Sequence, residues 1–400
     1  MKMKNKIRVN KPTRDKFLIF GSPQIEQNEI NEVVKCLKSG WIGTGPRVKK
    51  FEDDFKKYIG TKYSAALSSC TAALHLSLLA IGVKKGDEVI TTPMTFAATA
   101  NAIIHAGAKP VFVDVEKNTM NIDANKIEEV ISSKTKAIIP VHFAGRPCDM
   151  NKIMKISKNN DLYVIEDAAH AIESVYHGKK IGSIGDITCF SFYVTKNLVT
   201  AEGGMITTNN KEFAEKIQIY GLHGLSVDAW KRFSDKGFKH YEVITPGFKY
   251  NMTDIQASLG IHQLKRLNKN FQRRKKIWSM YNDLLKDLPI TLPYPEEKNT
   301  VHARHLYSIL INLEEVDATR DQIMNSLIHE NIGTGIHYKS LHLHQYYKNR
   351  FKFKKSDFPN AAYISDRTLS LPFSTKLSDN DIADVVKALK KIFSYYKSKK

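Results

Sequence analysis

The chain is poor in cysteine. Its 400 residues contain four, Cys36, Cys70, Cys148 and Cys189, and no two of them form a Cys-x-x-Cys pair. This spacing excludes a disulfide-dense scaffold and a cysteine-based zinc module, and we expect no metal site. Packed thiols are expected at most of these positions. Cys70 is the exception, because nearby positive charge would lower the pKa of its thiol and make it reactive.

The chain also lacks a long apolar run. No stretch approaches the roughly 18 to 20 apolar residues that a membrane-spanning helix needs. The first sixteen residues are rich in lysine and arginine but contain no apolar segment, which argues against a signal peptide. We therefore expect residues 1–16 to be a flexible basic leader and the protein to be cytoplasmic. Internal repeats and low-complexity tracts are absent as well.

Acidic residues are scarce relative to basic ones, 41 against 61, which gives a net charge of +20. Such a balance suits nucleic acid, an acidic membrane surface or a doubly charged small substrate. The densest basic cluster, residues 265–276, lies on a helical pattern with interleaved apolar positions, and predicts a solvated helix face. No nucleic-acid-binding signature accompanies it, so charge alone supports a nucleic-acid partner.

Short apolar segments alternate with helix-sized segments along the first part of the chain. They lie at residues 87–92, 110–113, 137–140 and 163–165, a rhythm that predicts a mainly parallel α/β sheet. One long helix is expected from Thr253 to Leu285, after which prolines mark the passage into a second domain. We place a large domain at 17–265 and a small one at 266–400, whose last helix is capped by Ser378.

Lys196 is the most informative residue. It follows Ser191 by five positions and precedes Glu202-Gly203-Gly204, while Asp167 ends the apolar segment Leu162–Asp167 upstream. Ligands of open α/β sheets collect at the carboxyl ends of such strands. A lysine and a carboxylate there suit pyridoxal phosphate (PLP): the amine forms a Schiff base and the carboxylate keeps the ring nitrogen protonated. A lone lysine near a Gly-Gly turn is usually a solvated loop residue, so the whole constellation carries the argument.

A second constellation is the turn Ser68–His75, whose small, hydroxyl-rich start gives way to an apolar helix. Free backbone N–H groups and the helix dipole favour a phosphate at such a start, and Thr71 adds a hydroxyl donor. Ser and Thr are also common helix caps without any ligand, so the turn alone is weak evidence.

Several longer motifs resemble the PLP-dependent nucleotide-sugar aminotransferases of the aspartate-aminotransferase fold (fold type I). The motifs are Ser39–Pro46, Gly86–Ile90, Pro140–Gly145, Glu166–Ala171 and Ala201–Gly204. The resemblance implies a mainly parallel large domain and a smaller α+β C-terminal domain. It also implies a role for each of these residues: Lys196 binds the cofactor covalently, Asp167 contacts the pyridine nitrogen, His170 lies near the ring hydroxyl, Phe96 stacks on the ring, and Ser191, Cys70 and Thr71 hold the phosphate.

Within that family, Gly247–Asp254 and Ile332–Tyr338 look most like the enzymes that make UDP-4-amino-4-deoxy-L-arabinose. Relatives acting on other UDP- or GDP-linked 4-keto sugars share most of these positions. Two departures stand out. Many relatives have Asn where this chain has Lys249, and His where it has Tyr193. The resemblance implies a homodimer in which Lys249 and Asn251 reach the partner's cofactor phosphate.

The expected reaction is ping-pong transfer of an amino group from L-glutamate to the C4 ketone of a nucleotide diphosphate sugar, for surface polysaccharide or lipid A synthesis. Candidate substrate contacts are Trp41, Thr44, Tyr193, His337 and Lys339, with Arg304 less favoured for the pyrophosphate. Three alternatives stay open. They are a sugar dehydratase of the same fold, whose relatives have histidine in place of the lysine, a non-catalytic regulator, and a basic nucleic-acid-binding protein.

Overall fold

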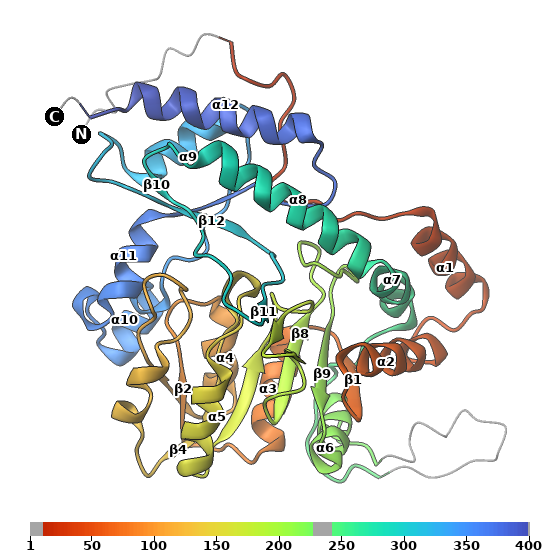
Figure 1. The fold of residues 1–400 in the computed structure, drawn as a ribbon. Helices are drawn as coiled ribbons and strands as arrows, with labels where there is room; N and C mark the ends of the chain where they lie inside the picture. The colour runs from red at the N-terminus through yellow and green to blue at the C-terminus, as the bar shows by residue number, and fades with distance from the viewer. Residues whose placement is uncertain (1–10, 227–241, 399–400) are drawn as a thin grey trace.

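A seven-stranded sheet forms the centre of the larger part of the molecule (Figure 1). The structure is a computed structural model that describes residues 11–226 and 242–398. β3, β2, β4, β5 and β8 run parallel, whereas β9 runs antiparallel to its neighbours β8 and β1. In spatial order the strands are β1 (Tyr63–Leu67), β9 (Gly204–Thr208), β8 (Ile187–Ser191), β5 (Tyr163–Asp167), β4 (Thr135–Ile138), β2 (Glu88–Thr91) and β3 (Lys109–Phe112).

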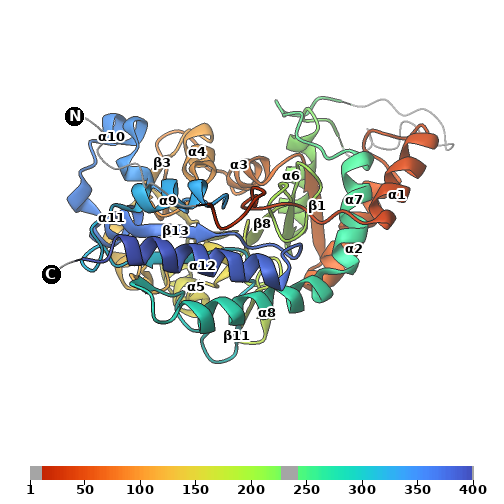
Figure 2. The ribbon, with the colours of Figure 1, turned by 90° about the horizontal axis from the view of Figure 1, so that it is seen from above.

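Helices cover both faces of this sheet because successive strand residues point to opposite sides. Val164 of β5 packs in one apolar cluster with Phe55 and Ile153, while Ile165 packs in another with Leu74. Seen from above, α3, α4 and α6 lie on one side of the strands and α5 lies on the other (Figure 2). One face carries α3 (Cys70–Ala80), α4 (Ala97–His105) and α6 (Lys211–Gly221), and the other α2 (Pro46–Ile59), α5 (Met150–Asn159) and α7 (Asp254–Lys265).

The C-terminal part has its own core. A three-stranded antiparallel sheet packs against long helices through buried residues such as Tyr281, Ile309 and Leu389. Its elements are α8 (Leu267–Leu285), β10 (Ile290–Thr291), β12 (Tyr307–Ile311), α9 (Arg320–His329), β13 (Thr368–Leu371) and α12 (Asp379–Tyr395). The remaining elements link the two parts or lie at their edges: α1 (Gln27–Lys38), β6 (Val175–Tyr176), β7 (Lys179–Lys180), β11 (Thr300–Val301), α10 (Gln345–Phe351) and α11 (Pro359–Arg367).

The mainly parallel α/β sheet predicted from the sequence is confirmed. The four apolar segments that predicted strands correspond to β2, β3, β4 and β5, and all four run parallel. The last helix is capped by Ser378, whose side chain accepts a hydrogen bond from the Asp381 N–H in a capping box. None of the helices in the described ranges is long and apolar enough to cross a membrane.

The prediction of one long helix from Thr253 to Leu285 is wrong. The helix is interrupted at Arg266, between α7 and α8. The guanidinium of Arg266 forms an ion pair with Glu29 at 2.5 Å. The prediction that the basic residues of this segment form a solvated helix face is wrong at two positions, where acidic side chains pair with the arginines. Arg266 is largely covered by its acidic partners, and Arg274 is buried in an ion pair with Glu173.

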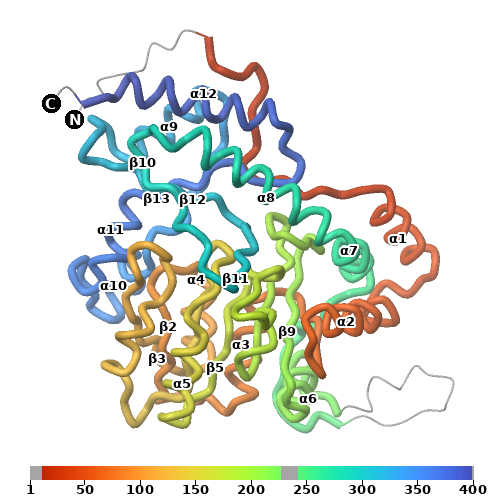
Figure 3. Tube along the Cα trace, viewed as in Figure 1, coloured from red at the N-terminus to blue at the C-terminus, as the bar shows by residue number. Residues whose placement is uncertain are grey.

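The predicted flexible leader also differs from the structure over its described residues, 11–16. The Thr13 N–H donates to Glu330 at 2.7 Å, and Arg14 binds Asp384 at 2.6 Å. The next residues continue along the same domain, because Leu18 forms a parallel bridge with Ile332. Figure 3 shows this segment passing α12 before it reaches α1. The start of the described chain is therefore fastened to the C-terminal domain.

Asp254 joins α7 to the loop that carries Trp41 and Thr44. This fully buried carboxylate accepts backbone N–H bonds from Gly45, Arg47 and Val48 at 2.9, 3.1 and 2.9 Å. It therefore satisfies the free donors at the start of α2.

We expect Asp254→Ala to lower the free energy of unfolding by about 3 kcal/mol, because buried donors that lose a charged acceptor are costly. Urea unfolding followed by circular dichroism measures the change. The control is Asp53→Ala, which removes an exposed ion pair of α2 with Lys49 and Lys56 and should change stability by less than about 0.5 kcal/mol. Equal effects of the two substitutions would contradict the capping role.

Candidate active site

The carboxyl ends of β5 and β8 bring Asp167 and Lys196 together. Asp167 is the last residue of β5 and pairs with Cys189 of β8, and the chain then turns so that the Lys196 N–H donates to the Tyr193 carbonyl at 2.8 Å. Lys196 is partly buried in this turn. The two residues interact electrostatically, since Asp167 raises the pKa of Lys196 and Lys196 lowers that of Asp167.

The Asp167 carboxylate is held in one orientation. It is 5 % exposed, and its two oxygens accept hydrogen bonds from the Thr99 hydroxyl at 2.8 Å and the Ala169 N–H at 3.1 Å. Burial raises the pKa of Asp167, and the two hydrogen bonds oppose that rise. A buried carboxylate without a fixed cation is suited to a ligand that brings positive charge.

Burial lowers the pKa of Lys196 from its ordinary 10.5 to about 8, although Cys70 and Asp167 act in the opposite direction. At neutral pH the neutral amine is therefore far more populated than in a solvated lysine. A neutral amine is the form that can attack a carbonyl or accept a proton.

α3 begins beside this lysine. Its cap is Ser69, whose side chain accepts a hydrogen bond from the Ala72 N–H at 3.0 Å, and the first N–H groups of the helix have no partner within the helix. Gly204 of β9 lies against this start, since a Cβ there would come within 2.4 Å of the Ser69 carbonyl carbon. The glycine of the Glu202-Gly203-Gly204 motif thus lets the helix start approach the sheet closely.

The prediction that Cys70 could be a reactive thiol is not supported. Burial raises the pKa of Cys70 well above its usual value, and the negative charge of Asp167 adds to the rise, while Lys196 opposes it only in part. Thr71, the next residue on α3, is exposed and can reach a ligand at the helix start.

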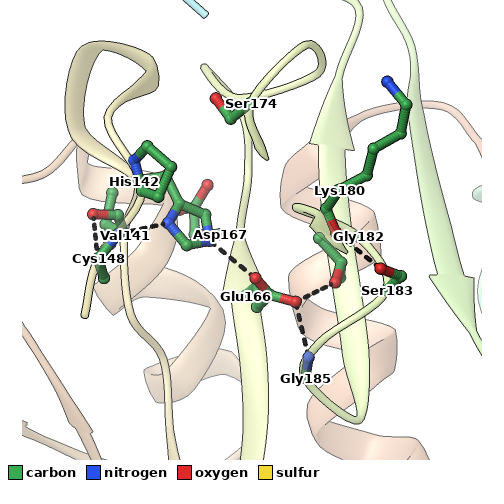
Figure 4. A network of polar contacts seen from close by, with 12 residues as sticks. Val141, His142, Cys148, Glu166, Asp167, Ser174, Lys180, Gly182, Ser183 and Gly185 are labelled. Carbon is green, nitrogen blue, oxygen red and sulfur yellow. Dashed lines mark hydrogen bonds and ion pairs between the residues drawn. The ribbon is translucent and has the colours of Figure 1, made fainter. Parts of the chain in front are cut away.

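A buried hydrogen-bond network is centred on Glu166 of β5. His142 Nδ1 accepts from the Cys148 N–H at 3.1 Å, so His142 Nε2 carries the ring proton and donates to Glu166 at 2.9 Å. The Glu166 carboxylate also accepts from Gly185 N–H and Thr188 hydroxyl at 2.8 Å each. Figure 4 shows this carboxylate between the His142 ring and Gly185. Burial would raise the pKa of Glu166, but these hydrogen bonds hold it below its usual range.

His170 has a defined tautomer. Its Nδ1 accepts from the Ala144 N–H at 3.2 Å, so the proton lies on Nε2 and points at the Tyr338 hydroxyl, 3.2 Å away. Burial and the charge of Lys196 lower the pKa of His170 well below its usual value. Tyr338 therefore accepts from the neutral ring and keeps its own proton for another acceptor. Phe96 also lies near Tyr338, with ring centroids 6.3 Å apart.

His337 completes the group around the lysine. Its Nδ1 is 2.8 Å from the Ser370 hydroxyl, and burial, assisted by Lys196, lowers its pKa to about 3. Four of the site residues predicted from the sequence, Lys196, Asp167, His170 and His337, thus lie together. Ser191 and Cys70 border the same region through β8 and α3.

Another set of predicted residues gathers elsewhere. Trp41, Thr44 and Asn251 line a cavity of about 500 Å³ between α2, β1 and α6, and Lys196 is not among its lining residues. Asn251 donates to the Thr44 hydroxyl at 2.6 Å, and Trp41 Nε1 donates to the Thr44 carbonyl at 3.2 Å. Within one chain these three residues therefore share a cavity that Lys196 does not line.

The remaining predicted residues are surface residues of the single chain. Lys249, Tyr193 and Lys339 are all exposed. Arg304 differs from the expectation that it could bind a pyrophosphate, because its guanidinium is paired with Glu296 at 2.8 Å and lies over the Trp278 ring.

Sequence reasoning missed several residues that the fold brings to the site. Thr99 contacts Asp167 from α4, Tyr338 contacts His170, and Asn197 and His305 form a hydrogen bond of 3.0 Å beside Lys196. Asn197 directly follows the lysine, which is a usable signal. The others come from distant segments and have no local pattern that marks them.

Comparison with known proteins identifies the family of this chain. Residues 23–390 match the model of the DegT/DnrJ/EryC1/StrS aminotransferase family. The chain belongs to this family. Among its relatives, the spore coat polysaccharide biosynthesis protein SpsC of Bacillus subtilis is 47% identical over 381 residues, which cover 95% of this chain and 98% of SpsC. An uncharacterized protein of Methanocaldococcus jannaschii is 54% identical over 381 residues, 95% of this chain and 99% of that one.

Solved structures of this aminotransferase family share the fold over nearly the whole length. The candidate sugar aminotransferase Spr1654 of Streptococcus pneumoniae, in its PLP form, superposes with a TM-score of 0.88 at 35% identity, covering 95% of this chain and 99% of that chain. Helicobacter pylori PseC, an aminotransferase involved in pseudoaminic acid biosynthesis, gives a TM-score of 0.88 at 30% identity and covers 95% and 100%.

The residues of this aminotransferase fit PLP. Its phosphate suits the free N–H groups at the start of α3, where Gly204 leaves the backbone accessible. Its ring nitrogen suits the buried, hydrogen-bonded carboxylate of Asp167, and its aldehyde suits the Lys196 amine with the lowered pKa.

The lowered pKa of Lys196 can be measured through cofactor uptake by the cofactor-free protein. Because attack requires the neutral amine, we expect the rate of borohydride-trappable PLP attachment to rise with pH around a midpoint of about 8 and to level off above it. Asp167→Asn should shift this midpoint to lower pH, since Asp167 raises the pKa of Lys196. Asp161→Asn, an exposed change just before the other end of β5, should leave it in place. A midpoint near 10.5 in the wild type would contradict the assignment.

Proposed function

We propose that the protein is a PLP-dependent aminotransferase that moves an amino group from L-glutamate to the keto group, at C4, of a nucleotide-linked keto sugar. The observation that carries the proposal is the pairing of buried Asp167 with partly buried Lys196 beyond the carboxyl ends of β5 and β8, where the pKa of the lysine is lowered to about 8. Family membership supports aminotransferase chemistry. We further propose that the enzyme acts in the cytoplasm.

Each residue of the site has a role in this reaction. PLP supplies an electron-withdrawing ring that stabilises negative charge at the carbon next to the transferred nitrogen. Asp167 binds the protonated ring nitrogen, and the start of α3 binds the phosphate. The Lys196 amine, once free, accepts a proton from the substrate carbon and returns it, a task that its lowered pKa favours. Neutral His170 and His337 keep additional positive charge away from that amine.

The sugar substrate is inferred from relatives. SpsC is named for spore coat polysaccharide biosynthesis, and PseC for an aminotransferase step in pseudoaminic acid biosynthesis. These names support a sugar destined for a surface polysaccharide. The finer resemblance to enzymes of UDP-4-amino-4-deoxy-L-arabinose synthesis makes UDP-linked 4-keto sugars the first compounds to test, followed by dTDP- and GDP-linked ones.

The direct test pairs the wild type with Lys196→Ala and measures glutamate-dependent amination of each nucleotide sugar by mass spectrometry. We expect Lys196→Ala to lose at least about 10⁴-fold of the rate, since no other described residue offers an amine at this place. Lys211→Ala, at an exposed lysine of α6, should keep wild-type turnover. A wild type that aminates no nucleotide sugar, or a Lys196→Ala variant with near-normal rates, would overturn the proposal.

We also propose that the active enzyme is a homodimer with shared sites. Large apolar side chains are exposed on the single chain, including Trp41 at 46%, Ile42 at 48% and Phe96 at 64%. Such exposure supports burial against a second copy. Exposed Lys249 lies just before Asn251, which forms a bridge with Leu67 at the end of the strand leading to α3. A partner's Lys249 and Asn251 could complete the phosphate site there.

Complementation tests the sharing. We expect Lys196→Ala protein and Lys249→Ala/Asn251→Ala protein to be inactive separately, and to regain about one quarter of wild-type activity after mixed refolding, because half of the dimers then hold one intact site. Either variant refolded alone serves as the control. No recovery from mixtures shown to contain heterodimers would rule out shared sites.

A further inference from the structure

His305 lies beside the reactive lysine but has no part in the roles described above. It precedes β12, is 5 % exposed, and its ring centroid is 4.3 Å from that of His170. Its Nδ1 is 3.0 Å from Oδ1 of Asn197, the residue that follows Lys196. His305 therefore belongs to the wall around the lysine.

The orientation of the Asn197 amide is fixed by two other partners. Its nitrogen donates to a carboxylate oxygen of Glu173 at 2.8 Å and to the Ala303 carbonyl at 3.1 Å. Both partners can only accept hydrogen bonds, so the amide nitrogen must face them. The Glu173 carboxylate is itself held by the buried ion pair with Arg274 of α8. The amide oxygen of Asn197 must then face His305.

This orientation fixes the tautomer of His305. An amide oxygen can only accept, so His305 Nδ1 carries a proton and donates it. Burial and the charge of Lys196 lower the pKa of His305 well below its usual value, which keeps the ring neutral. A neutral ring with a proton on Nδ1 has a bare lone pair on Nε2. Within residues 11–226 and 242–398, the one side-chain hydrogen bond of His305 is that of Nδ1 with Asn197, and Nε2 makes none.

The tautomer of His305 is opposite to that of its neighbour. His170 presents an N–H at Nε2, whereas His305 presents an acceptor at Nε2, and both are set by fixed backbone or amide groups. The fold thus places a hydrogen-bond acceptor without a proton near Lys196. An acceptor of this kind binds hydroxyl groups and repels carboxylates, which also only accept at neutral pH.

We propose that Nε2 of His305 accepts a hydrogen bond from a hydroxyl group of the sugar substrate and thereby favours the sugar over the dicarboxylic amino acid. The proposal rests on the proposed function, because it assigns the sugar's contact in the same site. Asn197 acts as a positioning residue, since it sets which ring nitrogen of His305 is bare. The carboxylates of glutamate gain nothing from this contact, as they have no proton to donate.

Separate measurements of the reaction with glutamate and of the reaction with the keto sugar distinguish a sugar contact of His305 from a structural role. His305→Asn keeps a donor at the position of Nδ1 and removes the atom at Nε2, whereas His305→Gln restores an acceptor near Nε2. We expect His305→Asn to raise the KM for the keto sugar about tenfold, the cost of one lost hydrogen bond, while the single-turnover rate with glutamate stays within about twofold of wild type. His305→Gln should recover part of the sugar KM.

Nitrogen NMR of the histidine-labelled protein gives a readout that does not depend on turnover. Nδ1 of His305 should be protonated and Nε2 unprotonated in the wild type, and Asn197→Ala should allow the other tautomer to appear. An Nε2-protonated His305 in the wild type would overturn the proposal. An unchanged sugar KM in His305→Asn, or equal losses with sugar and glutamate, would overturn it as well. If the wild type aminates no sugar at all, the proposed function itself fails, which is a different result.

Discussion

Burial of the Lys196 amine is the constraint on which the site depends. Removing an ammonium group from water disfavours its charged form, and the fold opposes that effect only partly, through Cys70 and Asp167. The pKa values of the histidines around Lys196 depend on the same constraint. Positive charge on Lys196 lowers the pKa of His170, His305 and His337, so the lysine and the rings cannot all be charged together. The result is a group of neutral histidines beside one lysine and one carboxylate.

The surrounding fold keeps this balance by fixing hydrogen bonds rather than by adding charge. Backbone N–H groups set the rings of His142 and His170, and an amide sets His305. Two of these partners, Ala144 and Cys148, lie in the segment between β4 and α5, and Asn197 lies in the turn after β8. The buried pair of Glu173 and Arg274 links this wall to α8, and thereby to the core of the C-terminal domain.

The sequence allowed the fold class to be predicted because apolar strand segments and helix-sized segments alternate along it in a regular order. Apolar strands at residues 88–91, 109–112, 135–138 and 163–167 alternate with helices, and parallel strands need such crossovers. The break at Arg266 could not be predicted, because the helical pattern continues through it and the acidic partners of Arg266, Glu26 and Glu29, are distant in sequence.

The site was predictable to a similar degree. Lys196 and Asp167 could be predicted from residue type and position. Asp167 ends an apolar strand, and Lys196 follows β8 and precedes Gly203-Gly204. Tyr338 and His305 could not be found, since their contacts to His170 and Asn197 join segments more than a hundred residues apart. The roles of Trp41, Thr44 and Asn251 remain predictions, because a single chain holds them around a separate cavity.

The attachment of residues 13–20 to the C-terminal domain links the two ends of the described chain. The described chain begins on that domain, crosses to the large domain at α1, and returns through the junction of α7 and α8. Residues far apart in the sequence, such as Arg14 and Asp384, thus belong to one folded unit. Local unfolding of that unit would release both segments together, because neither keeps these contacts without the other.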